Sequence, residues 1–255
     1  MAIVTITSDL GTRDYYLAAL KGAILSQSPT ALLADITSQI KTFDIKEAAY
    51  TLRNAYRYFP KGTIHVVHVN SSDSKSKLLL ALADGHSFLT FDNGFLSIAF
   101  EKMPHEIYQI NEELLTPDSL LHEDAIAKVI SLLFAEYRPT DFAQLTSNVI
   151  SYKSIQPVPS GNSLRAAVVS IDNFGNCVLN ITRQMFDDFV GNRSFTVMAN
   201  VGSTNTVSKN YSEVDEGDMV CLFNSGGYLE VAINKAKAEN LLGLKIDSPV
   251  LILLN

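Results

Sequence analysis

Apolar and polar positions alternate over the first residues of the chain and then take up a helical spacing. Residues 2–7 alternate β-branched and apolar side chains and end at the polar pair Ser8-Asp9, which is typical of a strand. Between Tyr16 and Leu25 the apolar residues recur at helical intervals, and Pro29 closes that region. The pattern predicts a strand followed by a helix.

The same order repeats along the next residues. A short apolar run over 31–36 predicts a second strand, and Asp44 with Glu47 three residues later predicts a capped helix that runs to about Tyr58. The apolar, β-branched run over 63–69 predicts a third strand. Strands and helices in alternation imply parallel strands joined by right-handed crossovers.

Shorter apolar runs follow the third predicted strand. They predict strands over 78–83, 87–91 and 95–100. Asp84-Gly85 and Asp92-Asn93-Gly94 separate these runs and are typical of hairpin turns. Apolar residues at helical spacing from Ile126 to Phe134 then predict a helix.

The pattern changes beyond residue 150. Pro157, Pro159 and Gly161 indicate a linker. Short strands are predicted after it, over 165–171, 177–181, 195–200, 219–223, 228–233 and 249–254. We therefore expect an α/β fold of two domains: an N-terminal, mostly parallel α/β sandwich over 1–150, a linker over 151–163 and a smaller C-terminal β-barrel-like domain over 164–255.

Composition narrows the range of functions. The 255 residues are 47% hydrophobic and carry a net charge of −7, which fits a globular protein and argues against a nucleic-acid partner. Apolar runs stay far below the ~20 residues that span a bilayer, and the first residues lack the features of a signal peptide. Cys177 and Cys221 lack metal-site spacing, so we interpret them as free, buried thiols. We expect a cytoplasmic protein with no membrane partner.

Polar residues gather where the predicted strands end. Asp9 follows the first strand, Asp35 ends the second and Asn70 follows the third. Open α/β sheets bind ligands at the carboxyl ends of their strands, although a single such Asp is more often a helix cap or a turn residue. Neither GxGxxG nor GxxxxGK[ST] occurs, so a dinucleotide or triphosphate cradle is not expected.

Two histidines, His65 and His68, lie in the third predicted strand, where we expect them to share one face. A histidine pair is half of a typical transition-metal site. No carboxylate stands at metal-ligand spacing from the pair, so we interpret both histidines as structural and predict no metal site.

Motifs spread over nearly the whole chain resemble those of one family. They are Thr7-Ser8-Asp9-Leu10-Gly11-Thr12-x-Asp14, Lys21-Gly22, Asp35-Ile36-Thr37, Phe59-Pro60-x-Gly62-Thr63, Asp92-Asn93-Gly94-Phe95-Leu96, Asp172-Asn173-Phe174-Gly175-Asn176 and Asn224-Ser225-x-Gly227-x-Leu229-Glu230. In this order they resemble the S-adenosylmethionine (SAM) hydroxide adenosyltransferases, which are relatives of the SAM-dependent fluorinases and chlorinases. No single motif is decisive, whereas the ordered set is specific.

The resemblance implies nucleophilic substitution at the ribose 5′ carbon of SAM. Water, acting as hydroxide, displaces methionine and yields adenosine and L-methionine. SAM is then the substrate, and no separate cofactor is expected. The resemblance also implies a homotrimer in which each site lies between the N-terminal domain of one subunit and the C-terminal domain of a neighbour.

Seven substrate-binding residues follow from the resemblance. Asp9 grips the ribose hydroxyls, Asp14, Asp172 and Ser225 receive the methionine ammonium, Asn176 bonds the adenine edge, Phe174 stacks on the adenine, and Phe43 forms a wall beside the ribose. Simpler interpretations exist for three of them. Asp9 suits a helix N-cap, Phe174 taken alone suits core packing, and Phe43 suits a hydrophobic staple at a helix entry.

The segment after the third strand departs from the family pattern. Hydroxide-type members carry an Asp, an Arg and a His as the water-activating set, and here Asn70, Lys77 and His122 stand at those positions. Asn holds a water but accepts no proton at neutral pH, and Lys lacks the planar fork of Arg. Asp73 is a substitute carboxylate or a solvated loop residue.

Three functions remain open at this point. The first is SAM hydrolysis with His122 as the base or its orienter, Lys77 as the cation and Asn70 positioning the water. The second is binding of SAM or adenosine with weak or no turnover. The third is the use of another nucleophile, as the halogenases do.

Overall fold

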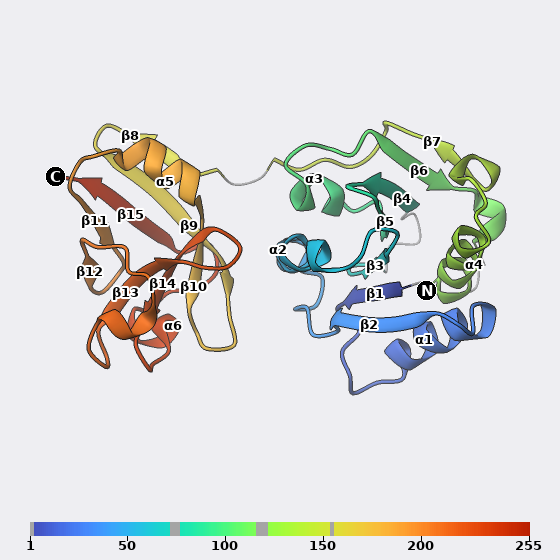
Figure 1. Cartoon of the computed structure of the whole chain (residues 1–255), viewed down its shortest axis with the longest axis horizontal. Helices are drawn as coiled ribbons and strands as arrows, with labels where there is room; N and C mark the ends of the chain where they lie inside the picture. Colours follow the sequence, from blue (N-terminus) through green and yellow to red (C-terminus); the bar gives the residue numbers. More distant parts are fainter. Residues whose placement is uncertain (1–2, 72–76, 116–121, 154–155) are drawn as a thin grey trace. The chain divides into compact units, whose positions relative to one another are not determined.

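In the computed structural model, which describes residues 3–71, 77–115, 122–153 and 156–255, the chain divides between Lys153 and Ser154 into two units. The N-terminal unit mixes helices and strands, and the C-terminal unit consists mainly of strands (Figure 1). Strand β8 (Val158–Ser160) lies within the segment predicted as a linker and pairs with β9 (Ser163–Ile171). The predicted α/β class is confirmed.

Among the described residues of the N-terminal unit, seven strands form one mixed sheet in the order β2-β1-β3-β5-β4-β6-β7. The strands are β1 (Ile3–Ser8), β2 (Leu32–Thr37), β3 (Ile64–His68), β4 (Leu78–Ala83), β5 (His86–Phe91), β6 (Glu106–Ile110) and β7 (Ala143–Leu145). Strands β2, β1, β3 and β5 are parallel, while β4, β6 and β7 pair antiparallel. The parallel strands bring the ends of β1, β3 and β5 to one edge.

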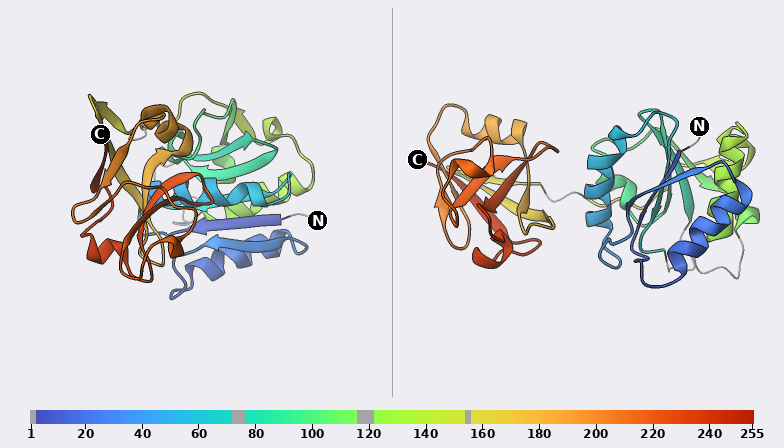
Figure 2. Two further views of the ribbon diagram at one scale, coloured as in Figure 1. Left: turned by 60° about the vertical axis from the view of Figure 1, so that its left-hand side comes forward. Right: turned by 60° about the horizontal axis from the view of Figure 1, so that its bottom comes forward.

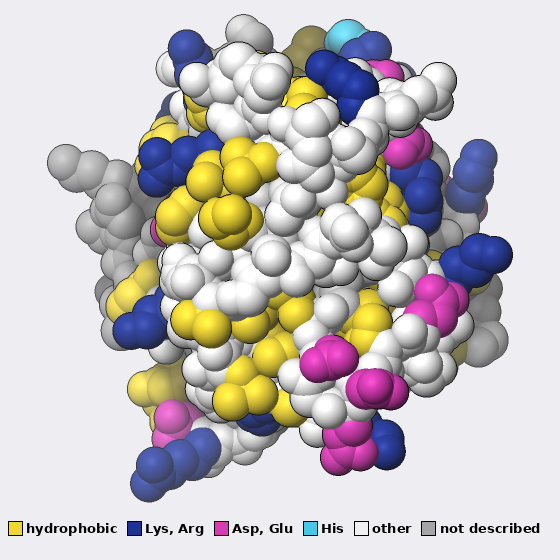
Figure 3. Space-filling model, turned by 90° about the vertical axis from the view of Figure 1, so that its left-hand side faces the viewer, with side chains coloured by type: hydrophobic (Ala, Val, Ile, Leu, Met, Phe, Trp, Pro, Cys, Tyr) yellow, Lys and Arg dark blue, Asp and Glu magenta, His cyan; other side chains and the backbone are white. Residues whose placement is uncertain are grey.

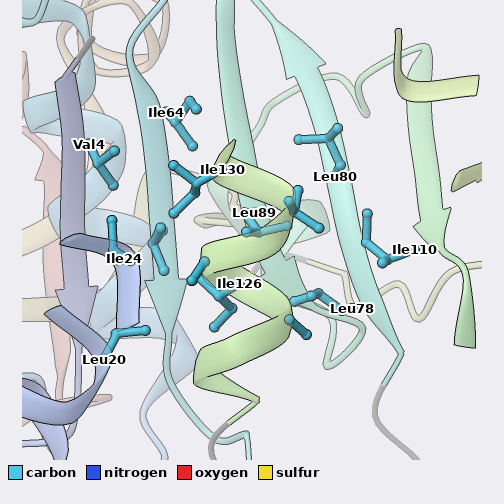
Figure 4. Packing of buried hydrophobic residues seen from close by; sticks show 14 of the residues in the cluster. Val4, Leu20, Ile24, Ile64, Leu78, Leu80, Leu89, Ile110, Ile126 and Ile130 are labelled. Carbon is cyan, nitrogen blue, oxygen red and sulfur yellow. The ribbon is translucent and has the colours of Figure 1, made fainter. Parts of the chain in front are cut away.

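Helices cover both faces of this sheet. They are α1 (Tyr16–Gln27), α2 (Ile45–Ala55), α3 (Phe95–Ala99) and α4 (Glu123–Phe134). The helices α1 and α4 lie on one face and α2 lies on the other (Figure 2). Between the sheet and the α1–α4 layer, aliphatic side chains such as Val4, Ile24, Leu80 and Ile130 form a hydrophobic core (Figure 4).

Helix α2 begins where the sequence predicts. The Asp44 carboxylate accepts the backbone N–H groups of Lys46 and Glu47, each at 3.0 Å, so the predicted N-cap is confirmed. The reciprocal half of the predicted capping box is wrong, because Glu47 accepts the backbone N–H of Lys41 at 2.9 Å instead. Glu47 thereby connects the segment at Lys41 to the first turn of α2 through a hydrogen bond.

The strand predicted over 95–100 is wrong, since Phe95–Ala99 is the short helix α3. The Asn93 side chain accepts the backbone N–H of Phe95 at 3.1 Å, and Gly94 takes a left-handed φ of 89°, so the chain turns into a helix directly after β5. Phe95, Leu96 and Ala99 share one helical face, which is buried in the α2 layer.

The C-terminal unit is an antiparallel, barrel-like sheet, as predicted. Its described strands follow the order β12-β11-β15-β9-β10-β14-β13, with β8 on β9. They are β10 (Cys177–Thr182), β11 (Phe195–Met198), β12 (Ser203–Thr204), β13 (Met219–Phe223), β14 (Tyr228–Ile233) and β15 (Pro249–Leu254). A bridge between Ser208 and Leu222 brings the two ends of the sheet together. Two helices, α5 (Arg183–Val190) and α6 (Ala238–Leu241), were not predicted.

The two cysteines lie inside this barrel. Cys177 on β10 and Cys221 on β13 are both in register with Val231 on β14, so one strand separates them. Two strand spacings amount to about 9.5 Å, which is too far for a disulfide. Both thiols are free, and burial raises their pKa to about 12.

The two histidines of β3 point to opposite faces, so the prediction that they share one face is wrong. They are three residues apart on a strand whose side chains alternate. His65 packs in the α2 layer against Tyr56 and Phe88, and His68 packs against Phe91 in the α1–α4 layer.

His65 belongs to a buried polar chain in the α2 layer. Its Nδ1 lies 2.7 Å from the Thr5 hydroxyl, and its Nε2 lies 3.1 Å from Nδ1 of His86. Burial lowers the pKa of His65 to about 3, helped by His86, and burial also lowers the pKa of His86. Both rings are therefore neutral in the folded protein at neutral pH.

This neutral pair predicts a loss of stability in mild acid. Below pH 6.5 the unfolded chain protonates His65 while the folded chain keeps it neutral, so the free energy of unfolding falls as pH drops towards 3, by up to about 1.4 kcal/mol per pH unit for His65. The lowered pKa of His86 acts in the same direction. Urea unfolding at pH 6.5 to 5 measures this slope. His65→Gln reduces it, whereas the same change at the exposed His105 does not. An equal slope in the His65 variant contradicts the account.

Candidate active site

The carboxylate of Asp9 joins three loops at the carboxyl edge of the N-terminal sheet. Its Oδ2 accepts the backbone N–H of Phe43, after β2, at 2.9 Å and that of Asn70, after β3, at 3.2 Å. Both residues have a left-handed backbone, with φ of 67° for Phe43 and 50° for Asn70. A left-handed Phe is strained, and such strain persists where its surroundings hold it in place. The structure thus brings Asp9, Phe43 and Asn70 together.

The alternative role for Asp9, a helix N-cap, is wrong. Helix α1 starts at Tyr16, and its N-cap position is Tyr15. Asp14 lies on the exposed bend just before this helix. Phe43 is 60% exposed, so it is not buried as a staple at the entry to α2.

A side-chain hydrogen bond also holds the loop after β5 against the end of β3. The Asn93 amide nitrogen donates to the carbonyl of Val69 at 2.9 Å, directly before Asn70. The Asp92 backbone N–H donates to the carbonyl of Lys77 at 2.8 Å. Lys77 and Asn70 therefore flank the same edge of the sheet, and Asp73 lies outside the described residues.

His122 stands at the start of α4 with a left-handed φ of 52°. Its ring lies 5.6 Å from that of Phe91, the last residue of β5. Its Nδ1 is buried and has no hydrogen-bond partner within the described part of the chain. Burial lowers the pKa of His122, and the carboxylate of Glu123 opposes that shift. The neutral ring can accept a proton at pH 7.

In the C-terminal unit, the carboxylate of Asp172 organises the loop after β9. Its Oδ1 accepts the backbone N–H groups of Phe174 and Asn176 at 2.9 Å each, and its Oδ2 accepts the Asn176 amide at 3.0 Å. Asn176 is buried, whereas Phe174 is 73% exposed. Core packing is therefore the wrong interpretation of Phe174, which presents an aromatic face to its surroundings.

Ser225 lies in the tight turn between β13 and β14. The Asn224 side chain accepts the backbone N–H groups of Gly226 and Tyr228, at 3.0 and 3.1 Å, and leaves Ser225 exposed at the tip. Gly227 has a left-handed φ of 77° that this turn requires.

A buried carboxylate beside this turn was given no role from the sequence. Glu230 is 3% exposed and accepts the Tyr211 hydroxyl at 2.7 Å. Burial raises the pKa of Glu230, hydrogen bonds from Tyr211 and Asn224 oppose this shift, and the charge of Asp172 adds to it. The pattern Leu229-Glu230 was visible in the sequence, but only the fold shows that this Glu is buried, on the side of β14 opposite the core residues Leu229 and Val231.

The surface charges and the described side chains bear on three kinds of site: for nucleic acid, for a metal ion and for a membrane. One face of the molecule interleaves Lys and Arg with Asp and Glu, without a continuous basic stripe (Figure 3). Within the described residues, no three His, Cys, Asp or Glu side chains are placed to hold a metal ion. None of the described helices combines the length and apolar character needed to cross a membrane.

Known proteins resemble this chain over nearly its whole length. The chain is 28% identical to a Methanocaldococcus jannaschii protein named (R)-S-adenosyl-L-methionine hydrolase, over 95% of this chain and 92% of that protein. A Thermus thermophilus protein of the same name is 24% identical over 99% and 100%. The crystal structure of an uncharacterized conserved protein from Thermotoga maritima shares the fold, with a TM-score of 0.87 at 24% identity over 99% of this chain and 100% of that one.

Both units match the domains of a single family. Residues 4–142 match the SAM hydroxide adenosyltransferase N-terminal domain, and residues 166–251 match the C-terminal domain of the same family. The chain therefore belongs to the SAM hydroxide adenosyltransferase family.

Proposed function

We propose that this chain hydrolyses SAM at the ribose 5′ carbon and produces adenosine and L-methionine. The observation that carries the proposal is the Asp9 carboxylate, which gathers Phe43 and Asn70 into one polar corner at the sheet edge. The two relatives named (R)-S-adenosyl-L-methionine hydrolase support the reaction class. SAM is the substrate, and we propose no separate cofactor.

The proposed binding roles divide between the two units. In the N-terminal unit, Asp9 accepts the ribose hydroxyls and the exposed ring of Phe43 lies beside the ribose. The methionine ammonium binds to Asp14, Asp172 and Ser225. The adenine edge bonds to Asn176, and the adenine ring stacks on Phe174. A carboxylate suits an ammonium group because the hydrogen bonds are charge-assisted.

The proposed chemistry is an in-line displacement. A water oxygen bonds to the 5′ carbon while the carbon–sulfur bond breaks, and its electron pair stays on sulfur, so methionine leaves as a neutral thioether. One water proton goes to the His122 imidazole and then to solvent. Asn70 positions the water, and Lys77 contributes positive charge.

We further propose a homotrimer whose sites lie between the N-terminal unit of one copy and the C-terminal unit of another. The exposed aromatic rings support this arrangement, since Phe43 is 60% and Phe174 73% exposed. Both rings are therefore accessible to a ligand or to another copy of the chain. A cytoplasmic location is also proposed, because buried, free Cys177 and Cys221 suit a reducing compartment.

Release of adenosine tests the proposed reaction. Purified protein incubated with SAM is expected to release adenosine, followed by chromatography, and His122→Ala is expected to lower that rate by ~10²–10⁴ because a positioned base is lost. Calorimetric titration checks that the variant still binds SAM. If the unaltered chain binds SAM and releases no adenosine, it is a binding protein and the proposed hydrolysis is wrong.

Asn70→Asp is expected to raise hydrolysis by about tenfold or more, since it restores a carboxylate to the water-activating set. Asp tolerates a left-handed backbone as Asn does, and the Asn70 backbone N–H is already fixed by Asp9. Asn148→Asp, on the exposed surface, controls for the added charge. An unchanged or lower rate in Asn70→Asp shows that this loop works in another way.

Mixing two variants tests the shared site. Asp9→Ala and Asp172→Ala are each expected to lose SAM turnover, and Asp9→Ala also to lose adenosine affinity. Hybrids formed by unfolding and refolding the two variants together contain some intact sites, so part of the activity returns. Asp44→Ala, which removes a helix cap at a cost of ~0.5–2 kcal/mol in stability, leaves adenosine affinity unchanged.

Two results count against this arrangement. A refolded mixture no more active than its components indicates a site within one copy. Unchanged adenosine affinity in Asp9→Ala removes the ribose role of Asp9.

A further inference from the structure

A polar pair interrupts the apolar α1–α4 layer at the edge that carries the candidate site. Ser8 of β1 and His68 of β3 are in register on neighbouring strands, and both residues are fully buried. One pleat earlier in the same layer, the corresponding positions are Ile6 and Val66. The change from aliphatic to polar side chains occurs only in the last row before Asp9 and Asn70.

His68 and His122 pack against the same aromatic ring. The ring of His68 lies 5.3 Å from that of Phe91 in an edge contact, and the ring of His122 lies 5.6 Å from it. One imidazole comes from the end of β3 and the other from the start of α4. Phe91 therefore holds two histidines at the end of the sheet where the nucleophile is proposed to enter.

Two buried atoms in this region have hydrogen-bonding capacity that the described residues do not use. The Ser8 hydroxyl and His122 Nδ1 are buried and have no hydrogen-bond partner among the described residues. Ser71 Oγ lies 3.5 Å from His68 Nδ1. Buried polar atoms almost always have a partner, either protein or ordered water. The row from Ser8 to His122 is therefore suited to hold a water molecule.

The other buried histidine of β3 provides the contrast. His65 is equally buried, yet its two ring nitrogens are met by Thr5 at 2.7 Å and His86 at 3.1 Å. It lies in the α2 layer, near the amino end of the strand. Described contacts account for both ring nitrogens of His65, whereas the Ser8 hydroxyl and His122 Nδ1 have no described partner.

We propose that His68 is a positioning residue for the attacking water and that, together with His122, it provides the proton-accepting capacity that Asn70 lacks. The inference rests on the proposed hydrolysis. In this arrangement the water donates one hydrogen bond to the imidazole pair as its oxygen approaches the 5′ carbon. The proton passes to an imidazole as the carbon–sulfur bond breaks, and solvent then takes it.

The charged groups around the pair set the pH response. Glu123 at the start of α4 raises the pKa of His122, whereas burial, the larger effect, lowers it. The Asp9 backbone N–H donates to the His68 carbonyl at 3.3 Å, so Asp9 lies beside the end of β3 that carries His68. Hydrolysis is therefore expected to fall in acid as the His122 imidazole takes up a proton.

His68→Gln and His68→Val test this inference against His65→Gln. Gln keeps hydrogen-bonding atoms without a base, and Val restores the aliphatic pattern of Val66, so at least one variant is expected to fold. Both are expected to lower kcat by about 10- to 100-fold, with SAM affinity unchanged and the acid limb of the pH–rate profile altered. His65→Gln is expected to lower stability in urea and to leave kcat and the pH profile unchanged.

The outcomes separate this inference from the proposed function. Adenosine release by the unaltered chain, with kcat and the pH profile preserved in a folded His68→Val variant, overturns the role of His68 alone. An equal loss of kcat in His65→Gln also overturns it, since any buried histidine of β3 then has the same effect. Absence of adenosine release from the unaltered chain overturns the proposed function and this inference together.

Discussion

The N-terminal half of the candidate site depends on one carboxylate oxygen. Asp9 Oδ2 accepts backbone N–H groups from the loops that follow the two strands beside β1. Hydrogen bonds to an ionised carboxylate are stronger than neutral ones, so this contact stabilises the left-handed conformations of Phe43 and Asn70. Without this carboxylate, the loops after β2 and β3 lose their shared hydrogen-bond acceptor, and the exposed Phe43 ring loses its fixed position. The proposed ribose binding and the loop geometry therefore depend on the same side chain.

The C-terminal unit uses the same principle on a different scaffold. Asp172 accepts two backbone N–H groups and one amide from its own loop, which fixes buried Asn176 and directs Phe174 outward. In both units an aspartate at a strand end organises the backbone first and presents an aromatic residue second. A substrate with a ribose, an adenine and an ammonium group offers partners for each of these prearranged groups, which is why the proposed roles divide between the units as they do.

Much of the fold follows from local pattern, and the exceptions have physical reasons. Alternating and helical spacing predicted β1, α4 and most barrel strands, and Asp44 predicted the start of α2. The run 95–99 is compatible with either period, and the short helix follows a left-handed Gly94 and a hydrogen bond from the Phe95 backbone N–H to the Asn93 side chain. Motifs selected Asp9, Asp172 and their neighbours. Other features depend on strand register and on the sign of φ, which a single sequence does not reveal. They are the hydrogen bonds from Phe43 and Asn70 to Asp9, the burial of Glu230 and the opposite faces of His65 and His68.

A crystal structure of the protein with bound SAM tests the central claim most directly, because it locates every part of the ligand relative to Asp9. The account predicts that both ribose hydroxyls lie within hydrogen-bond distance of the Asp9 carboxylate. It also predicts that the 5′ carbon faces the corner formed by Asn70, His122 and His68, and that Asp172 of a neighbouring copy lies at the ammonium group. A ligand whose ribose lies away from Asp9, or whose 5′ carbon faces an apolar wall, contradicts the account.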